Sequence, residues 1–145
     1  AIEYIYFVST WRILLSMSDD NQRINRIFIN FSNHPSTGWG KEQITEASKY
    51  GEIIDISFPD VDPELDSEDI SRLACKYAEK ILEYKPAAVM CQGEMTLCFK
   101  VVEILKSKGI LVLAACSARE ASSETLEDGS VVKTHKFRFV RFRSY

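Results

Sequence analysis

Between residues 26 and 116 the chain alternates short apolar runs with longer stretches in which apolar residues recur every three to four positions. Short apolar runs bounded by turn residues are typical of buried strands, and the longer spacing is typical of amphipathic helices. The expected strands are 27–31, 53–58, 87–91 and 110–116, and the expected helices are 41–50, a segment that ends before Pro86, and 94–108.

The middle helix carries the strongest signal. It follows a loop rich in Pro and Asp, and either Asp66 or Ser67 is the expected N-cap. The apolar positions from residue 70 to residue 82 keep helical spacing. Gly51 follows the first helix, at the position where a positive φ is favoured.

This alternation predicts an α/β fold. The strand at 87–91 has small residues and no polar alternation, as expected for a central parallel strand covered on both faces. Strand–helix–strand units are right-handed, so the elements should stack as a Rossmann-like three-layer sandwich. We expect a mainly parallel sheet in the order 2-1-3-4, closed by a C-terminal antiparallel β-hairpin.

The hairpin is signalled by the pair Asp128-Gly129. In the strand after it, the odd-numbered positions change from apolar to basic, so we expect a bulge or a departure from the core near Val140. The basic residues either face an anionic ligand or partner, or protect an edge strand with charge. They are Lys133, Lys136, Arg138, Arg141 and Arg143.

Composition narrows the class of protein. A chain of 145 residues with 46% hydrophobic and 27% charged residues fits one globular domain, which we place at 26–145. The net charge of −3 argues against a protein that coats long nucleic acid. Four cysteines without CxxC spacing indicate buried free thiols in a reducing cytoplasm.

Residues 1–25 form an expected N-terminal extension. The apolar stretch at 2–16 is too short for a comfortable membrane span, lacks a basic leading region, and carries Arg12 near its middle. A signal peptide is therefore disfavoured, and no membrane partner is expected. Met17 is the expected biological start, with the preceding residues not native.

Three of the four predicted strands end in polar sequences that could do chemistry. They are SNHPS after Phe31, QGEMT after Cys91, and SARE after Cys116. In open parallel sheets ligands bind outside the carboxyl ends of the strands, so these turns should share one crevice. The candidate ligand-binding residues are Ser32, Asn33, Ser36, Gln92, Gly93, Glu94, Thr96, Ser117 and Arg119.

Each turn has a chemical and a structural interpretation. His34 can titrate near neutral pH, and we take it as the candidate catalytic residue; alternatively, it is exposed beside a capping Asn33 or Ser36. Gly93 before a helix can bring the backbone close to a phosphate, or it can simply form a tight turn. The Arg119 guanidinium can bind a phosphate, or Glu120 can pair with it and neutralise its charge.

Several other chemistries are disfavoured. The chain has no GxGxxG, GxxxxGK[ST] or GxSxG sequence, which argues against a dinucleotide cofactor and a serine hydrolase. His34, Cys91 and Cys116 lack the spacing of a metal motif, and cysteine nucleophilic chemistry has no clear signature. We therefore expect no cofactor and no metal.

The runs IFINFSNHPSTGW, VMCQGEMTLCF, VLAACSARE and FRFVRFRSY resemble a group of small bacterial CRISPR-associated accessory proteins with a compact Rossmann-like fold. The resemblance covers residues 26–145. Relatives with the CRISPR-associated Rossmann fold (CARF) bind cyclic oligoadenylates, and some small members are ring nucleases that linearise these messengers to switch off the antiviral response. The resemblance thus implies a nucleotide-binding protein of CRISPR defence.

A homodimer would match the rotational symmetry of such a ligand. By this resemblance, cleavage needs no metal, because the ribose 2′-OH attacks its own 3′-phosphate. His34 would act as acid or base. Asn33 and Ser36 would donate to phosphate; Gln92, Gly93 and Thr96 would form a helix-end cradle, and Arg119 would clamp charge. A sensing or protein-interaction module without catalysis, and an enzyme on another small phosphorylated substrate, are the alternatives.

Overall fold

The computed structural model describes residues 26–145, so the expected extension at 1–25 and the expected start at Met17 lie outside the described residues. The described part of the chain forms five strands, three α-helices and one 3-10 turn. In chain order they are β1 (Ile27–Ser32), η1 (Ser36–Gly38), α2 (Lys41–Ser48), β2 (Glu52–Ser57), α3 (Ser67–Glu83), β3 (Ala88–Cys91), α4 (Met95–Ser107), β4 (Leu111–Thr125) and β5 (Val131–Ser144).

One mixed sheet runs through the molecule in the order β2-β1-β3-β4-β5. The first three neighbouring pairs are parallel, and β5 pairs with β4 in the antiparallel sense. The α/β class, the order of the first four strands and the closing antiparallel hairpin are confirmed.

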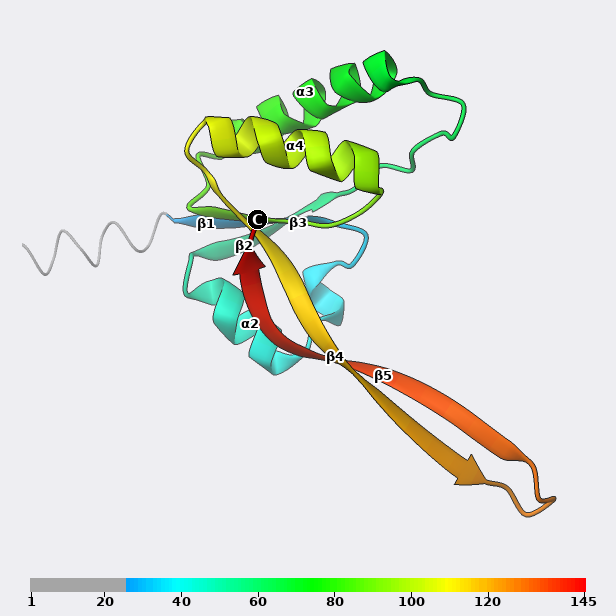
Figure 1. Ribbon diagram of the computed structural model, residues 1–145. Coiled ribbons are helices and arrows are strands. Elements are labelled where there is room, and N and C mark those ends of the chain that lie inside the picture. Colours follow the sequence, from blue (N-terminus) through cyan, green and yellow to red (C-terminus); the bar gives the residue numbers. More distant parts are fainter. Residues whose placement is uncertain (1–25) are drawn as a thin grey trace, which may run out of the picture.

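Helices lie on both faces of this sheet. Figure 1 shows α3 and α4 together on one face and α2 on the other. Phe31 belongs to the core under α3 and α4, where its ring packs 4.7 Å from that of Phe58 and 5.2 Å from that of Tyr77. Phe28 points to the α2 face, where its ring packs 5.4 Å from that of Phe142. Alternation along β1 thus separates two apolar layers.

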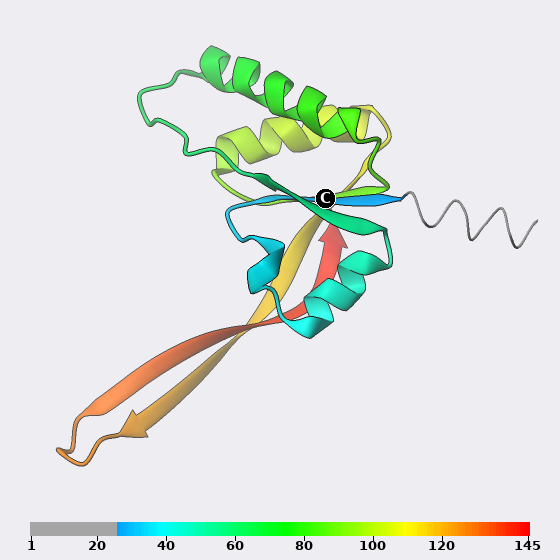
Figure 2. The same ribbon diagram turned by 180° about the vertical axis from the view of Figure 1, so that it is seen from behind.

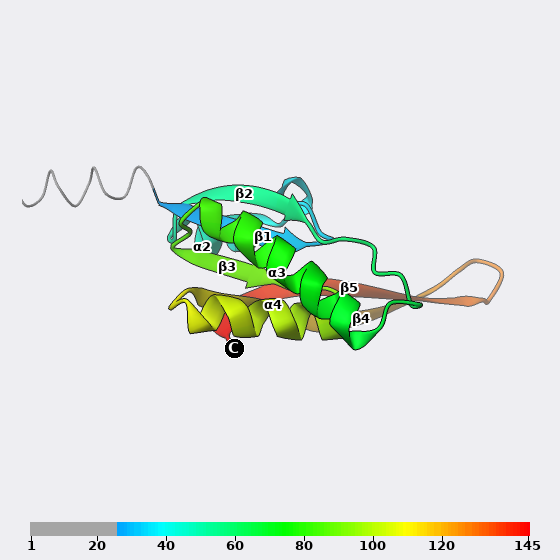
Figure 3. The ribbon, with the colours of Figure 1, turned by 90° about the horizontal axis from the view of Figure 1, so that it is seen from above.

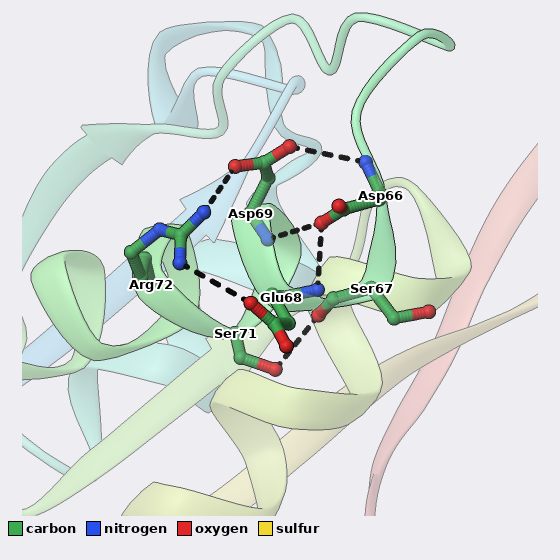
Figure 4. Close-up of polar contacts among 6 residues, drawn as sticks. All are labelled: Asp66, Ser67, Glu68, Asp69, Ser71 and Arg72. Atoms are coloured by element: carbon green, nitrogen blue, oxygen red, sulfur yellow. Dashed lines mark hydrogen bonds and ion pairs between the residues drawn. The ribbon is translucent and has the colours of Figure 1, made fainter.

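The start of α3 is fixed by a capping box (Figure 4). The Asp66 carboxylate accepts hydrogen bonds from the backbone N–H groups of Glu68 and Asp69, each at 2.9 Å. The Asp69 carboxylate accepts from the Asp66 N–H at 3.2 Å and pairs with Arg72. The Arg72 hydrogen bond, followed by the Asp66 N–H, lowers the pKa of Asp69. The capping role expected for Asp66 or Ser67 belongs to Asp66.

We expect Asp66→Ala to lower the free energy of unfolding by about 1 kcal/mol, because two N–H groups of the first turn lose their acceptor. Asp66→Asn keeps a capping oxygen and should retain most of that stability. Urea denaturation of the three proteins tests the difference. Equal losses for Asn and Ala would show that side-chain capping is not the source of the effect.

The β4–β5 hairpin projects well beyond the body of the domain (Figures 1 and 2). The sequence predicted that β4 would end at Cys116; instead it continues to Thr125, paired with β5 throughout. Cys116 pairs with Arg141 and the next residue pairs with Phe139, so Val140 is an extra residue on β5. The expected bulge near Val140 is confirmed. We call residues 117–139, beyond this bulge, the ribbon.

The bulge resolves the conflict in the β5 pattern. Before it, the odd-numbered Phe139 is buried; after it, the even-numbered Phe142 packs against the α2-face core, with 5.0 Å between the two rings. One inserted residue therefore keeps an aromatic side chain on the core face on both sides of the bulge. Arg141 and Arg143 fall on the opposite face and are exposed.

The four cysteines differ in environment. Cys91 and Cys98 are buried and Cys116 is half-buried, but Cys75 is exposed on α3. The expectation that all four thiols are buried is therefore wrong for Cys75, which lies at a helical position outside the apolar stripe.

Within residues 26–145, no helix has the length and apolar character that crossing a membrane requires.

Candidate functional site

The polar ends of β1, β3 and β4 come together at the carboxyl edge of the sheet. Phe31 pairs with Cys91, and Met90 pairs with Leu113, so the next positions on the three strands form one row. Neighbouring strands lie about 4.8 Å apart, which places the row within about 10 Å. Figure 3 shows the parallel strands pointing toward the side on which the ribbon projects. The row consists of Ser32, Gln92 and Ala115.

Gln92 joins this row by hydrogen bonds. Its amide oxygen accepts from the Ala115 N–H at 2.9 Å, and its amide nitrogen donates to the Ala115 carbonyl at 3.3 Å. Its own N–H donates to the Phe31 carbonyl at 3.1 Å. Gln92 therefore extends the β3–β4 pairing with a side chain.

The SNHPS turn is held by a buried amide. Asn30 is 1% exposed, and its Nδ2 donates to Asp55 Oδ1 at 2.8 Å and to the His34 carbonyl at 2.9 Å. Its Oδ1 accepts from the Ser32 hydroxyl at 2.7 Å. The Asp55 carboxylate in turn accepts from the N–H and the hydroxyl of Ser36. This network fixes the backbone of the turn before any ligand binds.

The candidates in this turn consequently fall into two groups. Ser32 and Ser36 use their hydroxyls inside the network, so a structural role accounts for both. Asn33 and His34 have exposed side chains, while the His34 carbonyl also accepts from Trp39 Nε1 at 3.0 Å. The structure thus presents an exposed imidazole on a backbone that the hydrogen-bond network holds.

The position of Gly93 has no room for a side chain, because the Phe58 ring lies against it. A Cβ at this position would lie 2.6 Å from ring atoms of Phe58, which is itself buried against Phe31. The structure therefore supports the tight-turn interpretation: β3 can pass into α4 only with a residue that has no side chain there.

We expect Gly93→Ala to lower the free energy of unfolding by about 2 kcal/mol, because the added methyl group overpacks a fixed aromatic ring. Gly38→Ala is the matched control, since a Cβ there meets nothing within 4 Å. Thermal unfolding of both variants tests this. A Gly93→Ala protein as stable as the Gly38→Ala control would mean that Phe58 can move aside.

The N–H groups of the helix-end phosphate cradle expected from Gln92, Gly93 and Thr96 already have a partner in the chain itself, the candidate residue Glu94. The Glu94 carboxylate accepts from the N–H groups of Thr96 at 3.1 Å and Leu97 at 2.8 Å, and from the Thr96 hydroxyl at 2.8 Å. The Leu97 N–H is the main cause of the lowered pKa of Glu94. Because its folded-state pKa is depressed, the cap stabilises the protein at neutral pH and weakens as the pH falls through that pKa. The structure gives Glu94 the capping role.

The sequence predicted that Ser117 and Arg119 lie in a turn after the fourth strand. The structure places them within β4 instead, in the first part of the ribbon. They pair with Phe139 and Phe137, so they share the α2 face of the sheet with Gln92. Both are exposed. Glu120 pairs with Arg138 at 2.7 Å and not with Arg119, so the suggested neutralisation of Arg119 by Glu120 is wrong.

A separate groove of about 1220 Å³ lies along α3 and α4, on the opposite face. Met95 and Phe99 are its most exposed apolar side chains, at 81% and 64%. Gly93, Thr96 and the edge residue Gln92 reach this groove, whereas the SNHPS and SARE residues do not. We call it the α3–α4 groove; it is lined by Leu65, Asp66, Ser67, Ile70, Gln92, Gly93, Met95, Thr96, Cys98, Phe99, Lys100, Val102, Glu103, Lys106 and Tyr145.

The sequence interpretation missed two kinds of residue. Asn30 and Asp55 organise the first turn, and their signal was a single polar residue inside each apolar run, IFINF and IIDI. Tyr145 lines the groove and donates to the Cys91 carbonyl at 2.7 Å, a contact across 54 positions without a local signal. No cluster of three or more potential metal ligands occurs within residues 26–145.

No curated protein and no solved structure matches this chain at a significant level. One family model, described as that of the uncharacterized protein MJ1673 family, matches residues 26–143. This range spans all of the described strands and helices except the last residue of β5. The chain therefore belongs to the MJ1673 family.

Proposed function

We propose that the protein binds a cyclic oligoadenylate at the carboxyl edge of its sheet and cleaves it as a metal-independent ring nuclease of CRISPR antiviral defence, in the cytoplasm. The proposal includes a Rossmann-like classification of the fold. The observation that carries it is the row at the sheet edge, which joins the SNHPS turn, Gln92 and the start of the ribbon on one face.

The chemistry of that face suits an anionic ring. Asn33 and His34 present exposed polar side chains, Ser117 adds a hydroxyl, and Arg119 adds a guanidinium that can donate twice to one phosphate. β5 contributes further positive charge, since residues 131–145 contain five Lys and Arg and no Asp or Glu. The N-terminus of α4 takes no part in phosphate binding in this proposal, because the Glu94 carboxylate already accepts hydrogen bonds from its N–H groups.

In the proposed reaction, a ribose 2′-oxygen loses its proton and attacks the adjacent 3′-phosphorus. The bond from phosphorus to the 5′-oxygen of the next nucleotide breaks, and that oxygen takes up a proton. The His34 imidazole transfers one of these protons. Arg119 stabilises the charge that builds up on phosphate, and the Asn30 network holds the backbone that carries the imidazole.

A C2 dimer would complete the site. A ring with internal rotational symmetry is best enclosed by two copies of the same edge, related by the same axis. The ribbon stands clear of the body of the domain and is free to reach a second copy (Figure 2). Light scattering with and without ligand measures this assembly; a protein that stays monomeric in both conditions contradicts it.

The test is incubation with labelled cyclic tetra-adenylate and cyclic hexa-adenylate in EDTA. We expect linear product from the wild-type protein and a loss of at least about 100-fold in rate for His34→Ala, the range typical of a general acid or base. His135→Ala is the matched control, because His135 is an exposed histidine in the ribbon, outside the proposed catalytic set.

Each outcome separates the candidate functions. Undiminished cleavage by His34→Ala removes the catalytic role of that residue. Tight binding without turnover supports a nucleotide sensor. With neither binding nor cleavage, both messenger functions are rejected, and another small phosphorylated substrate becomes the candidate.

The α3–α4 groove favours one second function, that of a protein-interaction module. Met95 and Phe99 stand one helical turn apart on α4, and Leu65 adds a third exposed apolar side chain. Contiguous exposed apolar surface of this kind is characteristic of interaction sites. This candidate gains support if the edge proves unable to bind nucleotides.

A further inference from the structure

Two thiols lie together beneath the α3–α4 groove. Cys91 ends β3 and Cys98 lies in the first turn of α4, with 3.5 Å between their sulfur atoms. Cys98 Sγ is also 3.8 Å from the Tyr145 hydroxyl, which donates to the Cys91 carbonyl at 2.7 Å. Cys98 lines the groove, whereas Cys91 is completely buried. One thiol therefore faces the groove and the other lies directly behind it.

The surroundings make the two thiols unequal. The hydrogen bond between the two sulfur atoms is the main cause that lowers the pKa of Cys98, against the opposing effect of burial. The same hydrogen bond, with burial, raises the pKa of Cys91. Cys98 lines the groove and is 7% exposed, whereas Cys91 is 0% exposed, so Cys98 is the thiol that a molecule in the groove can reach. A thiolate is the nucleophilic form of cysteine, and the direction of the pKa change agrees with Cys98 as the attacking residue.

We propose that Cys98 is a modification site for low-molecular-weight disulfides of the glutathione type, with Cys91 as the resolving thiol. The inference is independent of the function proposed for the sheet edge. The two thiols lie beneath the α3–α4 groove and their reaction needs no nucleotide; of the row at the sheet edge, Gln92 alone also lines this groove.

The reaction balances as two thiol–disulfide exchanges. Cys98 Sγ attacks one sulfur of the small disulfide, forms a mixed disulfide, and expels the first small thiolate. Cys91 then loses its proton, attacks Cys98 Sγ, and expels the second small thiolate. The two protein thiols are oxidised to one disulfide, and the small disulfide is reduced to two thiols. The sulfur atoms must approach from 3.5 Å to about 2.05 Å to form this bond.

The bridge would enclose the β3–α4 turn. Residues 92–97 lie between the two cysteines, and among them Gln92 holds β4 through its amide. Oxidation would therefore tie the start of α4 to the end of β3 by a covalent bond, where packing and the Glu94 cap now hold it.

The test is incubation of the reduced full chain with oxidised glutathione at neutral pH, followed by alkylation of free thiols and peptide mass mapping. For the wild type we expect a Cys91–Cys98 disulfide, recognised by the loss of two hydrogens from the linked peptides. Cys91→Ser should stop at the mixed disulfide on Cys98. Cys98→Ser should form neither product at this pair, and Cys116→Ser should form the bridge as the wild type does.

Two outcomes overturn the proposal. The first is a wild-type protein in which exposed Cys75 acquires glutathione while Cys91 and Cys98 stay alkylatable. The second is a folded Cys91→Ser protein that accumulates no adduct on Cys98. The wild-type map stands without any variant, and circular dichroism shows whether Cys91→Ser is folded; Cys91→Ala replaces it if it is not.

Discussion

Replacing Gly51 by alanine should lower the free energy of unfolding by about 4 kcal/mol, the sum of backbone strain and overpacking. Gly51 has a φ of +148°, which side-chain-bearing residues rarely adopt. Its missing Cβ would lie 2.2 Å from the Arg26 carbonyl oxygen and 2.7 Å from the Ile27 nitrogen. Both are backbone atoms at the start of β1, and they are held there because the Glu52 N–H donates to that carbonyl at 2.9 Å.

Gly109→Ala is the matched control for this result. Gly109 also has a positive φ, +77°, and follows α4, but a Cβ there meets nothing within 4 Å. Only the conformational penalty remains, about 1 kcal/mol. Urea denaturation should therefore rank the wild type, Gly109→Ala and Gly51→Ala in falling order. Equal losses for the two variants would mean that the backbone contact at Gly51 relaxes freely.

Asn30→Ala should cost about 3 kcal/mol, because removing one buried amide leaves several polar groups without their partner. The Asp55 carboxylate and the His34 carbonyl each lose a donor, and the Ser32 hydroxyl loses the nearer of its two acceptors. The SNHPS turn should loosen as well, so cleavage or binding at the edge should weaken although Asn30 touches no ligand. Denaturation and the cyclic oligoadenylate assay, run on the same variant, measure the two effects.

Two further variants sharpen this prediction. Asn33→Ala removes an exposed amide from the same turn and should change stability by no more than about 0.5 kcal/mol. Asn30→Asp places a second carboxyl beside Asp55, which raises the pKa of one of the pair. A raised folded-state pKa gives stability that is lost as the pH rises, so this variant should be more stable near pH 4 than at pH 7. A flat pH profile for Asn30→Asp would place the two carboxylates farther apart.

The sheet was predictable from the sequence because its signals are local. Apolar runs, the N-cap at Asp66 and the glycine at position 51 each determine their own segment, and right-handed crossovers then restrict the strand order. The bulge at Val140 was predictable for the same reason, since a strand that keeps one face apolar cannot continue through Arg141 without an extra residue.

The site was less predictable because its roles depend on distant partners. Gln92, Gly93 and Thr96 have the composition of a phosphate cradle, but only the geometry shows that Glu94 accepts the N–H groups at the start of α4. The SARE sequence has turn-like polarity, yet pairing with β5 extends it as a strand. Asn30 acquires its function from Asp55, 25 positions away, and a sequence pattern does not show that contact.

The ribbon has a consequence for how the molecule opens. Beyond Val140 its two strands have mostly exposed side chains and pair only with each other, and isolated two-strand pairs are marginally stable in water. Amide hydrogens there should exchange with deuterium through local fraying, far faster than those of β1 and β3, which exchange only when the whole domain unfolds. Val140 would then mark the border between slowly and rapidly exchanging amides. The ribbon could therefore change conformation around a partner without unfolding the rest of the domain.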